Sequence, residues 1–205
     1  MKAVGLHRHL PIDDPESLVD LDVPKPAPRG RELLVEIKAI SVNPVDYKIR
    51  ARRDPNSQFP RILGWDASGI VREVGPGVQL FKPGDEVYYA GSIQKPGANS
   101  EYHVVDERIV GHKPRQLGFA AAAALPLTTL TAWEGLFDRL DISSSGADRG
   151  KSVLLIGAAG GVGSIAIQLA KKLAGLRVVA TASRPESAQW VKELGADVVV
   201  DHTGD

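Results

Sequence analysis

A glycine-rich stretch, GAAGGVG at residues 157–163, has the residue types and spacing that suit the binding of a phosphate group. It follows the apolar run VLLI and precedes SIAIQLAKKLAG, which is typical of a helix. A turn between a strand and a helix offers the free N–H groups and the positive dipole end of that helix to an anion. The stretch therefore predicts a dinucleotide site. The alternative is a tight turn that binds no ligand.

The spacing within this stretch is A-x-G-x-x-G, with an alanine where the usual dinucleotide motif has its first glycine. Gly160 lets the backbone approach a pyrophosphate, and Gly163 lets the helix pack close to the strand. The residues predicted to bind the cofactor here are Ala158, Gly160, Gly161, Val162 and Gly163.

The identity of the nucleotide depends on the end of the next strand. NAD sites usually carry an acidic residue about 20 positions past the turn, where it binds the ribose 2′-hydroxyl. This chain has TASRPES there, with Ser183 and Arg184 in place of an acid. A hydroxyl and a guanidinium suit a 2′-phosphate, so we expect NADPH. The segment 183–186 also reads as an S-x-x-E capping box with Pro185 in the first turn, and both interpretations can hold together.

The elements that must position these residues alternate between strand and helix after about residue 120. The expected strands are SVLLIG, LRVVATA and DVVVD, and the helices between them are GSIAIQLAKKLAG and PESAQWVKELG. Gly175 and Gly195 stand where helices end. Right-handed crossovers make such a sheet parallel. Upstream, FAAAALPLTTLTAWEGLFDRL predicts two helices that meet near Pro126.

Residues 1 to about 120 hold short β-branched or alternating runs separated by Pro and Gly, which predicts a small barrel or sandwich. The net charge is zero, which argues against nucleic acid or a membrane surface as a partner. The absence of cysteine excludes disulfides and thiolate metal sites. No signal peptide and no membrane-length apolar run is evident, so we expect a soluble cytoplasmic protein.

Five stretches of the sequence together resemble one known family. They are VNPVDYKIR, ILGWDASGIVREVGPGV, FKPGDEVY, LTTLTAWEGL and GAAGGVGSIAIQLAKKLAG, in that order. Over nearly all of its length the chain resembles the medium-chain dehydrogenase/reductases, and among them the quinone oxidoreductase-like members, often catalogued as zinc-type alcohol dehydrogenase-like proteins. The resemblance implies an α/β plus mostly-β fold. A GroES-like barrel domain at residues 1–124 is followed by the first half of a Rossmann doubly wound parallel sheet at residues 125–205.

Three parallel strands are half of a doubly wound fold, and they leave one edge and one face of the sheet uncovered. In the family, the chain continues through the rest of the sheet. We therefore expect the 205 residues to be the N-terminal portion of a longer chain. The resemblance also implies a homodimer.

The zinc alcohol dehydrogenases of this family hold their catalytic metal with Cys, His and Cys. At the matching positions this chain has Asn43, Trp65 within Gly64-Trp65-Asp66, and Leu127. Indole, amide and leucine side chains do not make the donor set that catalytic zinc needs, so we predict no metal. The five histidines are expected to be surface or packing residues: His7, His9, His103, His112 and His202.

A site without zinc lacks the Lewis acid that polarises a simple carbonyl. Hydride addition to a conjugated system needs less help, because charge spreads onto oxygen as hydride reaches carbon and hydrogen-bond donors can assist. We therefore predict NADPH-dependent reduction of quinones or α,β-unsaturated carbonyls. The alternatives are an alcohol dehydrogenase, with or without zinc, and a protein that binds NADPH without catalysis.

The resemblance assigns roles to five further residues, all predicted as catalytic. Asn43 matches a position beside the nicotinamide ribose, although it also suits an Asn-Pro turn. Tyr47 and Lys48 are candidate hydrogen-bond donors, and the family often carries the tyrosine one place later, at Lys48. Thr131 matches a threonine that faces the nicotinamide, so it is also a predicted cofactor contact; otherwise it is a helix hydroxyl bonded to backbone. Trp65 and Asp66 are expected to wall the pocket; the alternative for Trp65 is that it is a core residue.

Overall fold

The structure is a computed structural model that describes residues 1–52, 59–201 and 203. The chain forms two compact units, unit 1 over Met1–Leu127 and unit 2 over Thr128–Asp205. Each unit has hydrophobic clusters of its own, so each is described by itself.

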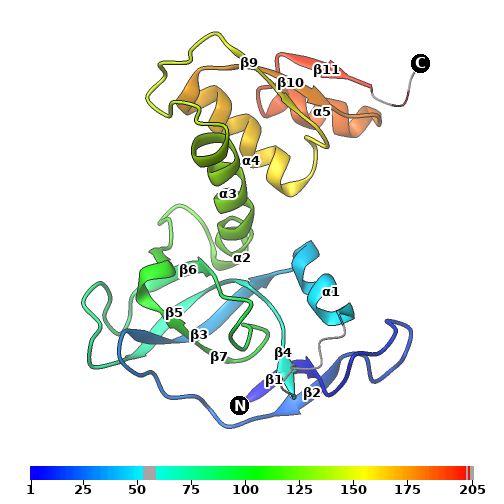
Figure 1. The fold of residues 1–205 in the computed structure, drawn as a ribbon. Coiled ribbons are helices and arrows are strands. Elements are labelled where there is room, and N and C mark those ends of the chain that lie inside the picture. The colour runs from blue at the N-terminus through cyan, green and yellow to red at the C-terminus, as the bar shows by residue number, and fades with distance from the viewer. Residues whose placement is uncertain (53–58, 202, 204–205) are drawn as a thin grey trace. The chain divides into compact units, whose positions relative to one another are not determined.

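Unit 1 is built mainly from short antiparallel strands in two sheets (Figure 1). The five-stranded sheet has the order β7-β3-β5-β6-β8, and the three-stranded sheet has the order β2-β1-β4. The strands are β1 Lys2–Leu6, β2 Val19–Asp22, β3 Glu32–Ser41, β4 Arg61–Ile62, β5 Asp66–Val74, β6 Glu86–Ala90, β7 Tyr102–Asp106 and β8 Val110–His112. The helices are α1 Pro44–Ala51, η1 Glu107–Ile109 and α2 Phe119–Ala123. The prediction of many short strands in this half is confirmed.

The pairing of β3 with β5 brings the future site together. These strands are antiparallel, and Ser41 at the end of β3 lies opposite Asp66 at the start of β5. The chain leaves β3 through Asn43 directly into α1, so the start of that helix must lie beside Asp66. Val35 and Val71 lie opposite each other in this pairing and are fully buried, and burial of such positions fixes the register.

Unit 2 contains the alternating strands and helices that the sequence predicts. Its strands are parallel and have the order β11-β10-β9. The strands are β9 Ser152–Leu155, β10 Arg177–Thr181 and β11 Val198–Val200; the helical segments are α3 Pro126–Trp133, which starts two residues before the unit, η2 Glu134–Arg139, α4 Gly161–Leu169, η3 Ala170–Ala174 and α5 Pro185–Glu193. Pro126 opens α3 after α2 has ended, as expected for a proline at a helix start. Gly175 ends the α4–η3 helix in the left-handed conformation, at a φ of 66°.

The outer strands of this parallel sheet have unpaired edges. Within the described part of the chain, β9 and β11 each pair with β10 alone. Leu154 on β9 is 57% exposed, and Ile156 just after it is 80% exposed. The prediction of an uncovered edge is therefore confirmed. None of the described helices is both long and apolar enough to span a membrane.

Candidate functional site

The glycine-rich stretch forms a tight turn between β9 and α4. Gly157 has a φ of 64°, a conformation that favours glycine. Its N–H donates to Thr181 Oγ1 at 2.9 Å, and its carbonyl accepts from the N–H of Gly160 at 3.1 Å. Thr181 ends the neighbouring strand β10, so the two carboxyl ends of parallel strands hold the turn between them. Sequence reasoning missed Thr181, although its place at the end of the second strand was a usable signal.

Gly163 packs against the turn with no room for a side chain. A Cβ at this position would lie 2.5 Å from both Cα and O of Ala158, which is fully buried. The sequence predicts that Gly163 lets the helix pack close to the strand, and in the structure the close neighbour of Gly163 is the backbone of the turn itself. Gly160 is the N-cap of α4 and has no side chain that could cap the helix. The first N–H groups of α4, at Gly161 and Val162, therefore suit an anion.

Ser183 and Arg184 are exposed and follow the end of β10. Arg184 is the N-cap of α5, and Pro185 is its first helical residue. No side chain caps this helix, so the interpretation of residues 183–186 as a capping box with Ser183 as N-cap is wrong. The helix begins one residue later than that motif requires, because Pro185 presets the first helical φ. The Arg184 guanidinium approaches Ser187 Oγ at 3.5 Å.

In unit 1, one buried carboxylate joins two other segments of the chain. Asp66 Oδ2 accepts from Asn43 Nδ2 at 2.8 Å, and Asp66 Oδ1 accepts from the backbone N–H of Leu127 at 2.8 Å. Asp66 has no exposed surface, and Asn43 is 7% exposed. The structure thus brings together two residues that sequence reasoning had named separately.

Asn43 is the N-cap of α1, which also agrees with its interpretation as an Asn-Pro turn residue. It forms a reciprocal capping box with Asp46, and the N–H of Asn43 donates to Asp46 Oδ2 at 2.6 Å. Asp46 was not identified from the sequence, although an acid three residues after an Asn N-cap is a recognisable signal.

Burial sets the electrostatics of this cluster. Loss of solvation raises the pKa of Asp66 to about 6, and the hydrogen bonds from Asn43 and from the Leu127 N–H offset only part of that rise. The nearby Asp46 carboxyl raises it further, and burial raises the pKa of Asp46 as well. Among the ion pairs of the described residues, none involves either carboxyl group. The cluster is therefore a buried acidic site without a paired cation.

Three other predicted residues have exposed side chains. Tyr47, 59% exposed, and Lys48 occupy the outer face of α1, opposite the buried Asp46 and Arg50. Thr131 is exposed on α3 within unit 2.

The positions that hold zinc in the family carry unsuitable donors here. Trp65 is 1% exposed and packs among Leu6, Leu63 and other apolar residues, while its indole N–H donates to the carbonyl of Ser92 at 3.0 Å. The Asn43 amide nitrogen is committed to Asp66, and Leu127 has an aliphatic side chain. Over residues 1–52, 59–201 and 203, no group of three or more His, Cys, Asp or Glu side chains is placed to hold a metal ion. These residues do not fit a catalytic zinc.

His103 is the most deeply buried of the described histidines. Its Nε2 faces the carbonyl of Pro96 at 2.9 Å, which can only accept, so Nε2 carries the proton and Nδ1 accepts from the Tyr89 hydroxyl at 2.9 Å. Burial lowers the pKa of His103. His103 is thus a packing residue, as predicted, whereas His202 lies outside the described residues.

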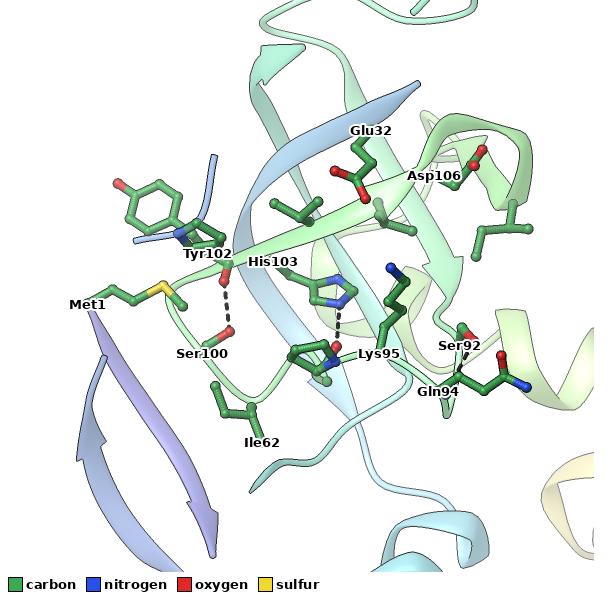
Figure 2. Close-up of a pocket in the computed structure, with 16 residues that line it drawn as sticks. Met1, Glu32, Ile62, Ser92, Gln94, Lys95, Ser100, Tyr102, His103 and Asp106 are labelled. Carbon is green, nitrogen blue, oxygen red and sulfur yellow. Dashed lines mark hydrogen bonds between the residues drawn. The ribbon is translucent and has the colours of Figure 1, made fainter. Parts of the chain in front are cut away.

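A cavity of about 390 Å³ lies elsewhere in unit 1, along β7 (Figure 2). It is bordered by that strand, by the loop at residues 92–97, and by Met1, Pro26 and Ile62. None of the residues predicted to bind substrate or cofactor lines it.

Two family models match the sequence. The alcohol dehydrogenase GroES-like domain matches residues 29–129, and the zinc-binding dehydrogenase model matches residues 161–205. A zinc-type alcohol dehydrogenase-like protein of Staphylococcus aureus is 45% identical over the whole chain, which spans 61% of that protein. A 2-methylene-furan-3-one reductase of Solanum lycopersicum is 40% identical over 90% of the chain and 48% of its own length.

Solved structures agree with these matches. One is a structure from Rhizobium etli that is assigned as a zinc-dependent alcohol dehydrogenase. It is 57% identical, with a TM-score of 0.93, and the match covers the whole of this chain and 59% of the Rhizobium etli chain. The Escherichia coli quinone oxidoreductase complexed with NADPH is 34% identical with a TM-score of 0.85, over the whole chain and 60% of its own. The chain thus spans about three fifths of the length of these relatives.

The fold and the family models define an oxidoreductase class that joins a GroES-like domain to a Rossmann-like parallel sheet. Within that class, the chain belongs to the medium-chain dehydrogenase/reductase superfamily, and zinc-type alcohol dehydrogenase-like and quinone oxidoreductase-like proteins are among its relatives. The predicted fold class and the predicted family are confirmed.

Proposed function

We propose that this protein is an NADPH-dependent oxidoreductase that delivers hydride to a quinone or an α,β-unsaturated carbonyl without a catalytic metal. The observation that carries the proposal is the glycine turn, where Gly157 and Gly160 lead into α4 and the start of that helix has no side-chain cap. The NADPH complex of the Escherichia coli relative supports the choice of cofactor. The tomato relative supports the substrate class, because its name describes a methylene group next to a ketone.

Both predicted parts of the cofactor site fit the nucleotide chemically. The N–H groups at the start of α4 suit the pyrophosphate, with Ala158, Gly160, Gly161, Val162 and Gly163 shaping the turn. Ser183 and Arg184 are exposed where a 2′-phosphate would bind, and a guanidinium can bind a phosphate with two hydrogen bonds. We propose these residues, with Thr131, as the NADPH contacts.

NADPH supplies the hydride when it is bound. In that reaction the hydride would add to a carbon of the conjugated acceptor, charge would develop on the acceptor oxygen, and a proton from water would complete the reduction. We propose that Asn43, Tyr47 and Lys48 donate hydrogen bonds around the reacting groups, since such donors stabilise charge that develops on oxygen. Asp66 belongs to the same proposal through its bond to Asn43.

The test is the loss of NADPH absorbance when the natural full-length polypeptide is mixed with a quinone or an enone. We expect turnover with both acceptor types and faster turnover with NADPH than with NADH. Tight NADPH binding without turnover on any acceptor would favour the non-catalytic alternative.

The assignment of the 2′-phosphate is tested by Arg184→Ala. Removal of one charge-assisted contact should weaken NADPH binding about 10- to 100-fold and leave NADH binding unchanged. Arg139→Ala, which removes another exposed arginine of unit 2, is the matched control and should change neither affinity. Unchanged NADPH affinity in Arg184→Ala would show that the phosphate lies elsewhere.

A zinc-dependent alcohol dehydrogenase is the second candidate, because the Rhizobium etli relative is described as zinc-dependent. Metal analysis of the purified protein separates the two candidates, and stoichiometric zinc would contradict the proposal. The homodimer and the cytoplasmic location stay predictions, and sedimentation of the natural polypeptide checks the first.

A further inference from the structure

One side chain holds together three stretches of unit 1 that are far apart in the sequence. Asp66 starts β5, Asn43 begins α1, and Leu127 lies in the first turn of α3. The two oxygens of Asp66 bind one donor from each of the other two residues, both at 2.8 Å. In related zinc enzymes these stretches carry the metal ligands, whereas here a carboxylate makes the cross-link.

We propose that Asp66 is a positioning residue that fixes the amide of Asn43 and the backbone at Leu127. This inference rests on the proposed function for the role of Asn43. Asp66 has no exposed surface, so it acts through its two partners and does not touch substrate.

The hydrogen bond to Asp66 restricts the side-chain amide of Asn43 to one orientation. An ionised carboxylate only accepts hydrogen bonds, so Asn43 must turn its Nδ2 toward Asp66. The capping box with Asp46 engages Asn43 at the start of α1. An amide held in this way presents the same group to a ligand at every encounter, which lowers the entropic cost of binding.

The cost of the arrangement argues for a role beyond stability. A buried carboxylate without a paired cation loses its solvation, and well-packed apolar residues of similar volume would usually be at least as stabilising. Asp46, the other carboxyl group of the cluster, increases that cost by repulsion. If the link served stability alone, apolar side chains would provide it with a smaller loss of solvation free energy.

Asp66→Asn tests the cross-link, because the new amide has one accepting oxygen: if it keeps the bond from the Leu127 N–H, the bond to Asn43 is lost or is kept only when the Asn43 amide turns over and gives up its capping bond. In the natural full-length polypeptide, we expect NADPH affinity to fall about tenfold. We also expect hydrogen exchange at the Leu127 or Asn43 backbone segment to become faster. Glu107→Gln is the matched control. Glu107 is also buried, but it anchors Arg31 and the N–H groups of Gln79 and Leu80, so its loss should lower thermal stability and leave NADPH affinity unchanged.

The exchanged pair Asn43→Asp with Asp66→Asn separates positioning from structure. The amide at position 66 can accept from the Leu127 N–H and donate to the carboxylate at position 43. Both hydrogen bonds are therefore restored, but the one between positions 43 and 66 now has its donor at position 66. We expect the unfolding temperature to recover toward that of the unaltered protein. NADPH affinity should stay at least tenfold lower, because a carboxylate then replaces the amide near an anionic cofactor.

Recovery of NADPH affinity together with stability in the exchanged pair would overturn the positioning role. Unchanged exchange rates and stability in Asp66→Asn would overturn the cross-link itself, and that result does not depend on cofactor binding. If Asp66→Asn does not fold, the exchanged pair provides the test: recovered stability supports the cross-link, and an exchanged pair that is also unfolded contradicts it. Failure of the proposed function is recognised separately, because the unaltered protein would then not bind NADPH.

Discussion

The glycine turn of unit 2 and the carboxylate cluster of unit 1 are built on opposite principles. The turn uses backbone groups from one stretch of seven residues, and it leaves the positive end of α4 without a side-chain cap. The cluster uses side chains from residues 43, 46 and 66 and a backbone N–H from residue 127, and it buries acidic groups without a paired cation. The turn is suited to receive an anion, while the cluster fixes its own members.

The two regions should therefore fail in different ways. The turn depends on the absence of side-chain atoms at particular positions, so added atoms should damage it most. The cluster depends on the charge and hydrogen-bonding capacity of one side chain, so isosteric changes and pH should affect it most. Three predictions test this contrast, in addition to the Arg184 and Asp66 experiments above.

Gly163→Val should have the largest effect. The added side chain would begin 2.5 Å from the backbone of Ala158, which cannot yield as a flexible side chain would. We expect unit 2 to lose about 3 kcal/mol or more of unfolding free energy and NADPH binding to disappear. Urea unfolding and cofactor fluorescence measure both changes.

Gly135→Ala is the control for this substitution, since a Cβ at Gly135 would meet no atom within 4 Å. It should be neutral or stabilise the helix by up to about 1 kcal/mol. If Gly163→Val bound NADPH like the unaltered protein, the close approach of helix and turn would not matter for the site.

Asp66 should give unit 1 an unusual pH dependence of stability. Its native pKa of about 6 lies above its ordinary value of 3.8, so the native state binds more protons than the unfolded state between these values. The stability that this group contributes is present below pH 4 and is lost as the pH rises toward and past 6, by up to about 3 kcal/mol.

The comparison that isolates this effect is the unfolding free energy of the unaltered protein minus that of Asp66→Asn, measured by urea unfolding from pH 4 to pH 7. This difference should fall as the pH rises through the window. A difference that rises instead would mean that Asp66 is stabilised as an anion, with its pKa below the ordinary value.

Thr181→Val should have the smallest effect of the three. It preserves the shape of a side chain that is 7% exposed but removes the oxygen that accepts from the Gly157 N–H. We expect a loss of about 1 kcal/mol in unfolding free energy and a modest loss of NADPH affinity. Thr181→Ser keeps the hydroxyl and should retain most of the affinity. Equal NADPH affinity in the valine and serine variants would show that the Thr181 hydroxyl does not support the turn for cofactor binding.

Much of unit 2 was predictable because its signals are local. The strand and helix periods lie within short windows, Gly175 and Pro126 mark helix boundaries, and Gly163 stands at a fixed distance from Ala158. The error at Ser183 has a local cause too, since two overlapping start signals, S-x-x-E and a proline, compete for the first residue of α5.

The cluster of unit 1 was only partly predictable. The sequence marks Asn43, Asp66 and Leu127 by their resemblance to family positions, but nothing in their spacing says that one carboxylate bonds to the other two. That contact follows from the register of β3 on β5, which sets Ser41 opposite Asp66. Register depends on the packing of whole strands, which a short sequence window does not contain.

The sequence by itself determined the local features of this protein. These are the glycine turn, the alternation of strands and helices, and the absence of the side chains that hold zinc. Those properties are set by residue type and by neighbours within a few positions. The tertiary structure decided which polar groups meet and which are buried, and so it decided that Asp66 holds Asn43 while Tyr47 and Lys48 face outward. Burial and long-range contacts arise only when distant strands pack, and they alone shift the pKa of Asp66 to about 6.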